Sequence, residues 1–162
     1  MDLVANNLSY KPDDQYHLNE VSFNFKEGNL YTILGRTLSG KTTLLKTIAG
    51  LLTPDSGEIE FDGKNFLKIP VWERNVAMVY QQFINYPHLN VFENIAFPLK
   101  QRKIDQSIIK EKVMDALKSV GLLGYENRKI QELSGGQQQR VSLARSLVKN
   151  ATLATFFLPE AL

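Results

Sequence analysis

A loop rich in glycine and hydroxyl residues provides the clearest chemistry in this sequence. Residues 35–42 read GRTLSGKT and match the pattern G-x-x-x-x-G-K-[ST] at every fixed position. The backbone amides of such a loop surround a polyphosphate, Lys41 adds a positive charge beside the terminal phosphates, and the Thr42 hydroxyl can ligate Mg²⁺. The predicted nucleotide-binding residues of the loop are Gly35, Arg36, Thr37, Leu38, Ser39, Gly40, Lys41, Thr42 and Thr43.

The elements on either side of the loop support this interpretation. The apolar run at residues 30–34 predicts a buried strand, and apolar residues recur at helical spacing over residues 41–52 until Pro54 stops the helix. This order of strand, loop and helix aims a helix N-terminus at the bound anion. The alternative is an ordinary glycine-containing turn before a helix that starts with lysine.

The remaining elements predict an α/β fold. Alternating residues at 21–25 and at 59–61, before the Asp62-Gly63 turn, indicate antiparallel strands near the N-terminus. Apolar runs at 76–80 and 151–158 predict buried strands, and helices are expected at 105–120, where Gly121 ends the helix, and from Gly135 to about Lys149. We therefore expect a mostly parallel sheet with an antiparallel β flank and no linker between domains.

Composition excludes several other classes of protein. The 162 residues are 43% hydrophobic and carry a net charge of +2 with the signs interspersed, so nothing demands nucleic acid or an anionic membrane surface as a partner. The absence of cysteine excludes disulfides and thiolate zinc sites, and two histidines are too few for a polyhistidine metal site. No run approaches the roughly 20 apolar residues of a membrane-spanning helix, so we expect a cytosolic chain.

A second motif, together with the first, carries a family resemblance. Residues 133–137 read LSGGQ and precede an apolar-periodic helix; alone, this motif is typical of a helix N-cap and turn. Together the two motifs resemble the ATP-binding subunits of ABC transporters, whose Walker A and signature sequences stand in this order. Residues 54–59, 79–81 and 86–95 also resemble that family, so the likeness extends from about residue 3 to residue 153.

The resemblance implies a P-loop NTPase fold and a particular assembly. Residues 1–162 would be one ABC nucleotide-binding domain, with a helical subdomain at about 83–145. Two such subunits would sandwich ATP and Mg²⁺ head to tail, and transmembrane permease subunits would hold them peripherally at the cytoplasmic face of the membrane. The helix N-terminus after the signature is a suitable second anion site. The signature residues contacting nucleotide in trans would be Leu133, Ser134, Gly135, Gly136 and Gln137.

The resemblance also implies roles for single residues. Gln81 would act catalytically by sensing Mg²⁺ and the attacking water, although a polar residue at a strand end is an alternative. Residues 83–92 would dock a helix of the membrane subunit. Tyr10, which follows the first strand, is the candidate to stack on adenine; Tyr16 is its rival, and ordinary packing is the alternative for both.

The expected function is that of the ATP-binding subunit of an importer. Within the family, the loop sequence and residues 79–87 look like subunits of bacterial carbohydrate or glycerol importers. The alternative is a soluble ABC-type ATPase acting on DNA or ribosomes, against which the near-neutral charge counts. Co-purification with a membrane protein, or with ribosomes or DNA, separates these two possibilities.

The last residues depart from the family pattern of an Asp-Glu pair before proline. If Pro159 is the family's proline, Phe157 and Leu158 occupy the two acidic positions; if Glu160 is the general base, Pro159 stands where the aspartate belongs. In either register the Mg²⁺-binding aspartate of Walker B is absent. We therefore expect a truncated, frameshifted or deliberately altered chain that is marginally folded, exposes a sheet edge, and binds ATP without hydrolysing it, with Glu160 as the remaining candidate base.

Overall fold

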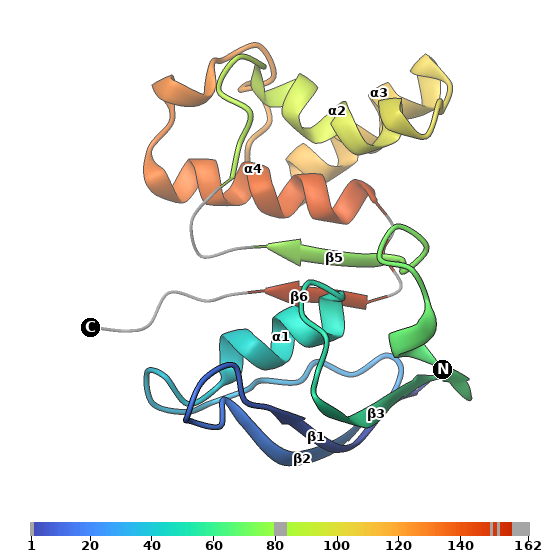
Figure 1. Cartoon of the computed structure of the whole chain (residues 1–162). Coiled ribbons are helices and arrows are strands. Elements are labelled where there is room, and N and C mark those ends of the chain that lie inside the picture. The colour runs from blue at the N-terminus through green and yellow to red at the C-terminus, as the bar shows by residue number, and fades with distance from the viewer. Residues whose placement is uncertain (1, 80–83, 150, 152, 157–162) are drawn as a thin grey trace. The chain divides into compact units, whose positions relative to one another are not determined.

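The chain contains both strands and helices, and the computed structural model describes it at residues 2–79, 84–149, 151 and 153–156. The chain divides into two units, residues 1–75 and residues 76–162 (Figure 1). The first unit contains β1 (Leu3–Tyr10), β2 (Leu18–Phe25), α1 (Lys41–Ala49), β3 (Ser56–Phe61) and β4 (Lys64–Asn65). The second contains β5 (Val76–Val79), α2 (Val91–Gln101), α3 (Gln106–Ser119), α4 (Gly135–Val148) and β6 (Leu153–Phe156).

The first unit is built on an antiparallel sheet with strand order β2-β1-β3-β4. Ala5 in the central strand β1 lies opposite Phe23 of β2 and Ile59 of β3, and both Ala5 and Ile59 are buried. The turn between β3 and β4 has positive φ at Asp62 (52°) and Gly63 (72°), as a two-residue hairpin requires. The predicted antiparallel flank and its Asp-Gly turn are therefore confirmed.

Helix α1 buries Leu44 and Ile48 but is shorter than its apolar spacing predicts. Gly50 adopts the left-handed conformation (φ 81°), and its amide donates to Thr47 O at 3.0 Å, so the helix stops after Ala49. The expected extension to residue 52 is wrong because a left-handed glycine ends the helix before Pro54 is reached.

The predicted buried strand at residues 30–34 is also wrong. No strand forms there in the described chain, and Leu30 and Leu34 are 91% and 86% exposed. The Tyr31 ring stacks on Phe25, and its hydroxyl accepts a hydrogen bond from the Lys26 amide at 2.8 Å. An apolar run becomes a strand only when a neighbouring strand supplies backbone partners, and the four-stranded sheet does not include these residues.

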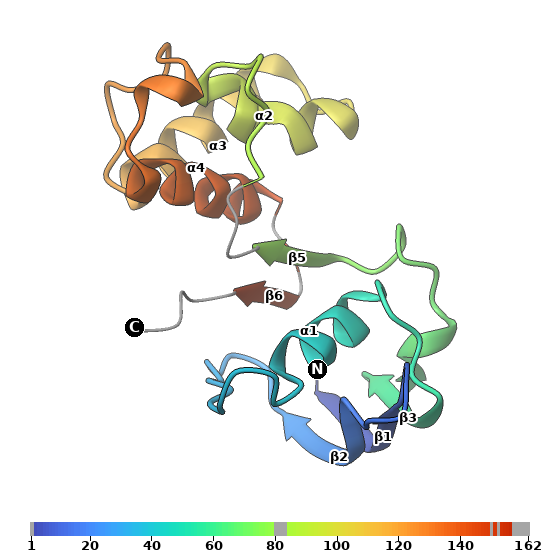
Figure 2. The ribbon, with the colours of Figure 1, turned by 60° about the vertical axis from the view of Figure 1, so that its left-hand side comes forward.

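The second unit is held by three helices that pack on one another, as Figures 1 and 2 show from two sides. Helix α2 begins with a capping box in which Asn90 Oδ1 accepts from the Glu93 amide at 2.7 Å. The cap and the burial of Val91, Ile95 and Leu99 outweigh the backbone hydrogen bond lost at Pro98, which lies within the helix. The buried core residues of the three helices and their connections are Val91, Ile95, Ala96, Leu99, Ile109, Val113, Ala116, Leu117, Val120, Leu122, Ile130, Leu133, Val141, Ala144 and Val148.

Strands β5 and β6 complete the second unit as a parallel pair in which Ala77 lies opposite Ala154. The strands expected at 76–80 and 151–158 are confirmed over the described residues of β5 and β6, and the α/β class is confirmed. Within the described chain, this pair is the only parallel pairing, so less of the sheet is parallel than the sequence predicted. The predicted helical subdomain, about 83–145, contains α2, α3 and most of α4. Among the described residues, no helix combines the length and apolarity needed to cross a membrane.

Candidate functional site

The predicted phosphate loop curls around the side chain of Lys41. Lys41 Nζ donates to Gly35 O at 2.6 Å and to Arg36 O at 2.7 Å, and the Ser39 amide donates to Arg36 O at 3.1 Å. The structure thus brings together the first glycine of the motif, its lysine and its serine. Because the ammonium group is held by exposed carbonyls, it can exchange them for phosphate oxygens, which bind a cation more strongly.

Helix α1 begins at the end of this loop with an uncompensated positive end. Gly40 provides no side-chain cap, and the first turn contains no acidic residue. The first intrahelical bond of this turn runs from the Leu44 amide to Gly40 O at 2.9 Å, so the amides of residues 41–43 precede it and point outward. The Thr42 side chain is exposed beside them. These groups fit an anion, and a polyphosphate is the anion that the lysine and hydroxyl suit best.

A side chain at either glycine of the loop would meet a neighbouring atom, and at Gly40 that atom belongs to the backbone and cannot rotate away. A Cβ on Gly35 would lie 2.5 Å from Ser39 Oγ, and one on Gly40 would lie 2.1 Å from His17 O. Gly40 also has a φ of 86°, which L residues rarely adopt. The close approach of Gly40 to His17 places the β1–β2 connection against the start of α1.

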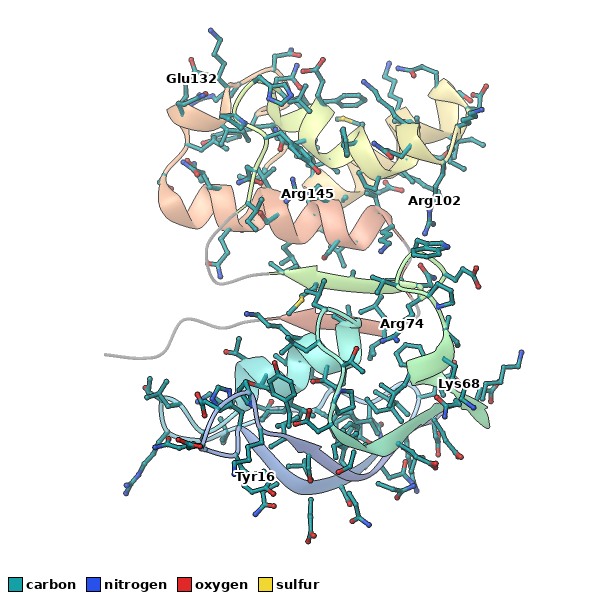
Figure 3. All side chains as sticks on the ribbon, in the orientation of Figure 1. Tyr16, Lys68, Arg74, Arg102, Glu132 and Arg145 are labelled. Atoms are coloured by element: carbon teal, nitrogen blue, oxygen red, sulfur yellow. The ribbon has the colours of Figure 1, made fainter. Side chains whose placement is uncertain are left out.

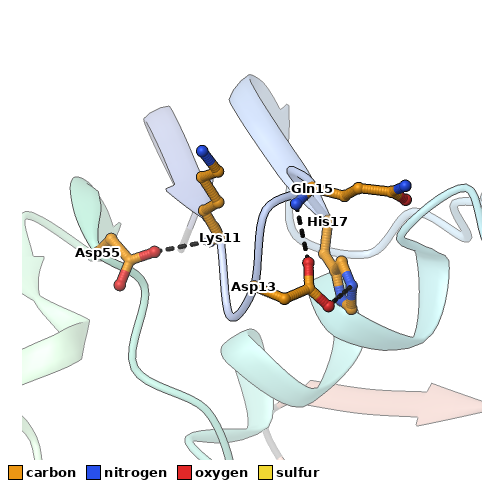
Figure 4. A network of polar contacts seen from close by, with 5 residues as sticks. All are labelled: Lys11, Asp13, Gln15, His17 and Asp55. Carbon is orange, nitrogen blue, oxygen red and sulfur yellow. Dashed lines mark hydrogen bonds and ion pairs between the residues drawn. The ribbon is translucent and has the colours of Figure 1, made fainter.

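That connection, residues 11–17, is ordered by short polar contacts (Figure 4). The Lys11 amide donates to Asp55 Oδ2 at 2.6 Å, and the Gln15 amide donates to Asp13 Oδ1 at 2.8 Å. Asp13 Oδ2 also lies 3.9 Å from His17 Nε2, an ion pair when the histidine is protonated. The connection therefore has a defined conformation beside the phosphate loop.

The two tyrosines predicted as adenine-stacking candidates flank this connection. Tyr10 is half-buried and makes an edge contact with His17, with 6.2 Å between the ring centroids. Tyr16 is 57% exposed, with Lys11 Nζ 5.3 Å from its ring centroid. Tyr16 belongs to the connection that contacts Gly40, and Tyr10 ends β1 directly before it. The choice between the two tyrosines stays a prediction.

The signature motif forms the N-terminus of α4. Ser134 Oγ accepts from the Gln137 amide at 3.3 Å, and Gln137 Oε1 accepts from the Ser134 amide at 2.9 Å, which is a capping box. Leu133 is buried in the helical core and anchors the motif, and Gln138 N donates to Ser134 O at 2.9 Å. Ser134 therefore is the helix N-cap that the motif alone predicts. The N-terminus of α4 can still attract an anion, because its first turn contains no acidic residue.

Nothing in the described part of the chain requires a glycine at position 136. A Cβ built on it would meet nothing within 4 Å, and its φ is not positive. In a helix, glycine is less stable than alanine by about 1 kcal/mol. Its presence is explained if something outside the helix approaches the backbone closely, as a phosphate in trans would.

The predicted magnesium chemistry lies mostly outside the described residues. Gln81 and Glu160 are not described, so only Thr42 of the predicted metal ligands has a defined position. Among the described residues, no cluster of three or more His, Asp or Glu side chains is placed to hold a metal. The described loop therefore fits the anionic part of a nucleotide, with a single hydroxyl available for its cation.

Sequence reasoning missed several residues that position these motifs. Asn94 is completely buried and binds the segment before α2, and Arg145 of α4 reaches the same segment. An asparagine on an apolar helix face and an arginine in a helix give no local signal of such roles. His17 was also missed, because its contact with Gly40 is made by the backbone carbonyl, which every residue possesses.

Comparison with known proteins decides the family. The family model described as ABC transporter matches residues 18–156, most of the chain. The chain belongs to the ABC transporter family. Spermidine/putrescine import ATP-binding proteins PotA are similar over 146 residues, 49% identical in Mycoplasma capricolum and 48% identical in Mycoplasma mycoides. The matches cover 90% of this chain but only 42% of each relative.

The similar proteins also bear on the expected solute and fold. A third PotA protein, from Acetivibrio thermocellus, is 47% identical and is matched over 88% of this chain and 40% of its own length. These three relatives give no support to a carbohydrate or polyol solute. The ATP-binding cassette MJ0796, solved as a dimer bound to ADP and Pi, superposes with a TM-score of 0.85 at 31% identity, covering 98% of this chain and 74% of that one. The structure of cbiO1 from Clostridium perfringens superposes with a TM-score of 0.84 at 27% identity, covering 95% of this chain and 64% of that one.

The contact between Gly40 and His17 yields the first testable prediction. Gly40→Ala places a Cβ against a backbone carbonyl at a residue with φ of 86°. The left-handed backbone conformation alone costs a non-glycine residue about 1–3 kcal/mol, and the clash adds to this cost. We expect the Kd for a fluorescent ATP analogue to rise at least about 10-fold. The matched control is Gly63→Ala, which also has positive φ but meets nothing within 4 Å and lies in the β3–β4 turn. Equal affinity of the Gly40 and Gly63 variants would refute the geometry of the loop.

Proposed function

We propose that this chain is the nucleotide-binding part of an ABC importer's ATP-binding subunit and that it binds ATP through residues 35–43. The observation that carries the proposal is the uncapped N-terminus of α1 beside a lysine held in the middle of the loop. Such a site offers several amide donors and one mobile cation to a polyphosphate. The proposal treats residues 1–162 as belonging to one nucleotide-binding domain.

Each group in the loop has a role that follows from its chemistry. When ATP binds, Lys41 would release the carbonyls of Gly35 and Arg36 and pair with the terminal phosphates. The amides at the start of α1 would hold the phosphates in place, and the Thr42 hydroxyl would ligate the Mg²⁺ that accompanies ATP. Tyr10, at the end of β1, or Tyr16, in the connection that contacts Gly40, would stack on the adenine.

The assembly we propose is a head-to-tail dimer with a second ABC ATP-binding subunit. Ser134 and Gly136 would contact the nucleotide held by the partner subunit. This is supported by the open space beside Gly136, where a Cβ would meet no described atom within 4 Å. The dimer would sit on transmembrane permease subunits at the cytoplasmic face of the membrane, with residues 83–92 as the docking segment. The relatives' names favour a polyamine such as spermidine or putrescine as the transported solute.

The first test of this function is nucleotide binding by a Lys41→Ala variant. Hydrogen bonds to a charged group contribute about 1.5–3 kcal/mol, so removing the ammonium group should raise the Kd for ATP about 10- to 100-fold while the backbone amides retain weak binding. Titration with a fluorescent ATP analogue measures the change. Lys46→Ala, on the same helix but beyond the loop, is the matched control and should bind like the unaltered chain. If the unaltered chain, Lys41→Ala and Lys46→Ala bind the ATP analogue with the same affinity, the assignment of residues 35–43 as the ATP site is wrong.

The second test separates binding in cis from contact in trans. Ser134→Asp keeps a helix-capping side chain but places a negative charge at the signature loop. It should leave nucleotide affinity of the monomer unchanged and abolish ATP-dependent dimer formation in sedimentation velocity runs. Ser119→Asp, at an exposed position of α3, adds the same charge elsewhere and should associate normally. Reduced nucleotide affinity of the Ser134 variant monomer would count against the trans arrangement.

We further propose that this chain binds ATP but does not hydrolyse it. The Mg²⁺-binding aspartate and general base of the family have Phe157 and Leu158, or Pro159 and Glu160, in their places. Loss of one charge-stabilising group typically costs about 10²–10³ in rate. The aspartate is lost in either register, and the base is lost as well in the first, so phosphate release from Mg-ATP should fall to the uncatalysed background. Turnover by the purified chain that disappears in Lys41→Ala would contradict this and make Glu160 the leading candidate for the base.

A further inference from the structure

The segment between β5 and α2 is fastened to α4 by side chains outside the recognised motifs. Asn85 Nδ2 donates to Gln138 O at 2.9 Å, and Asn85 Oδ1 accepts from Ser142 Oγ at 3.0 Å. Both partners are on α4, the helix that begins at the signature loop. A single short side chain thus uses its donor and its acceptor to hold the segment to that helix.

Arg145, which is labelled in Figure 3, lies one turn further along α4 and makes the second attachment. Its guanidinium donates to Ile84 O and, at 3.4 Å, to Asn94 Oδ1, and lies 5.1 Å from the centroid of the Tyr86 ring. No carboxylate pairs with it among the described residues, and burial lowers the pKa of the guanidinium. Its positive charge is therefore stabilised by carbonyl dipoles and an aromatic face, all supplied by the segment and α2.

Asn94 completes the attachment from the side of α2. It is completely buried; its Oδ1 accepts from the Tyr86 amide at 2.8 Å, and its Nδ2 donates to Tyr86 O at 3.0 Å and to Leu89 O at 3.1 Å. The backbone of residues 84–89 forms no helix or strand, so these side chains provide partners that secondary structure otherwise supplies. The segment is held between α2 and α4.

Helix α4 also holds the chain ahead of residues 80–83. Lys149, which follows the last turn of α4, donates from Nζ to Val76 O at 2.5 Å at the start of β5. Burial, followed by the charge of Arg102, lowers the pKa of this ammonium group. The same helix therefore contacts the chain both before and after the residues that include Gln81.

We infer that Arg145 is a positioning residue that, with Asn85, locks residues 84–86 to α4, so that the proposed docking segment and the signature loop move together. This coupling rests on the proposed function, in which a membrane subunit presses on residues 83–92 and Ser134 contacts nucleotide in trans. A planar guanidinium suits the role because its several donors have fixed directions and reach Ile84 and Asn94 at once. Lysine has no such fork and cannot replace it.

The first experiment measures local opening by amide hydrogen exchange in the full chain. In Arg145→Met, exchange at residues 84–89, including the Tyr86 amide, should rise about 10-fold or more, because hydrogen bonds to a charged donor are lost. Arg140→Met is the matched control, since Arg140 Nη1 donates to Val120 O at 3.2 Å from the same helix without touching the segment. Amides of the α2–α3 core should stay protected in both variants. Equal exchange at residues 84–89 in the two variants overturns the inference.

Two further variants distinguish positioning from general packing. In Arg145→Ala, added ethylguanidinium should restore protection of residues 84–89, whereas uncharged ethylurea should not; equal restoration by both assigns Arg145 a space-filling role only. Asn85→Asp keeps its size and its acceptor for Ser142 but cannot donate to Gln138 O, so it should also raise exchange locally. Unchanged exchange in Asn85→Asp overturns the role given to Asn85.

A covalent probe tests the coupling itself. The sequence contains no cysteine, so His88→Cys, at an exposed position of the segment, accepts a bulky maleimide at one site only. The label should alter exchange at residues 135–138 when Arg145 is present and leave it unaltered in Arg145→Met. No change in the presence of Arg145 overturns the coupling. Nucleotide affinity, measured in parallel, reports on the phosphate loop alone, so failure of the proposed function is distinguishable from failure of this inference.

Discussion

The backbone amides at the start of a helix need hydrogen-bond acceptors. The helices of this chain differ in whether their own side chains provide those acceptors and a negative charge. Helix α2 satisfies it internally through Asn90 and the carboxylate of Glu93. Helix α1 begins at a glycine without a side-chain cap, and α4 has an uncharged cap from Ser134; neither has an acid in its first turn. The two helices that begin at motifs thus keep positive N-termini, to which an anion is attracted. Helices α2 and α3 begin outside those motifs, and each has a carboxylate at its N-terminus, Glu93 in α2 and the Asp105 cap in α3.

A positive helix end becomes a selective site only when the chain around it is fixed. At α1, the contact between Gly40 and His17 fixes the loop from outside, and the bonds of Lys41 to its carbonyls fix it from within. At α4, buried Leu133 anchors the motif, and Arg145 attaches the helix to the neighbouring segment. The contacts at α1 and at α4 are both made within this chain, without a ligand. The backbone that would bind an anion is therefore already in place before the anion arrives.

Whether the sequence predicted a structural feature depends on how far apart in the sequence the residues that determine the feature lie. The Asp62-Gly63 turn and the helix from Gly135 were predicted because each depends on neighbouring residues. The end of α1 was misjudged because Pro54 and Gly50 are both stop signals and apolar spacing continues between them. The strand at 30–34 was wrong because its composition reports an apolar run and says nothing of which strand lies beside it.

The sequence by itself determined the family, the phosphate loop and the signature, since their chemistry resides in residue types at fixed local spacing. Only the tertiary structure decided that His17 O lies against Gly40 and that Arg145 joins Ile84 and Asn94, residues 61 and 51 positions away. Such contacts carry no local signal because a backbone carbonyl is present in every residue and a half-buried arginine looks like an exposed one in sequence. Their partners are chosen by the packing of the helices, which places distant residues together once the apolar core has formed.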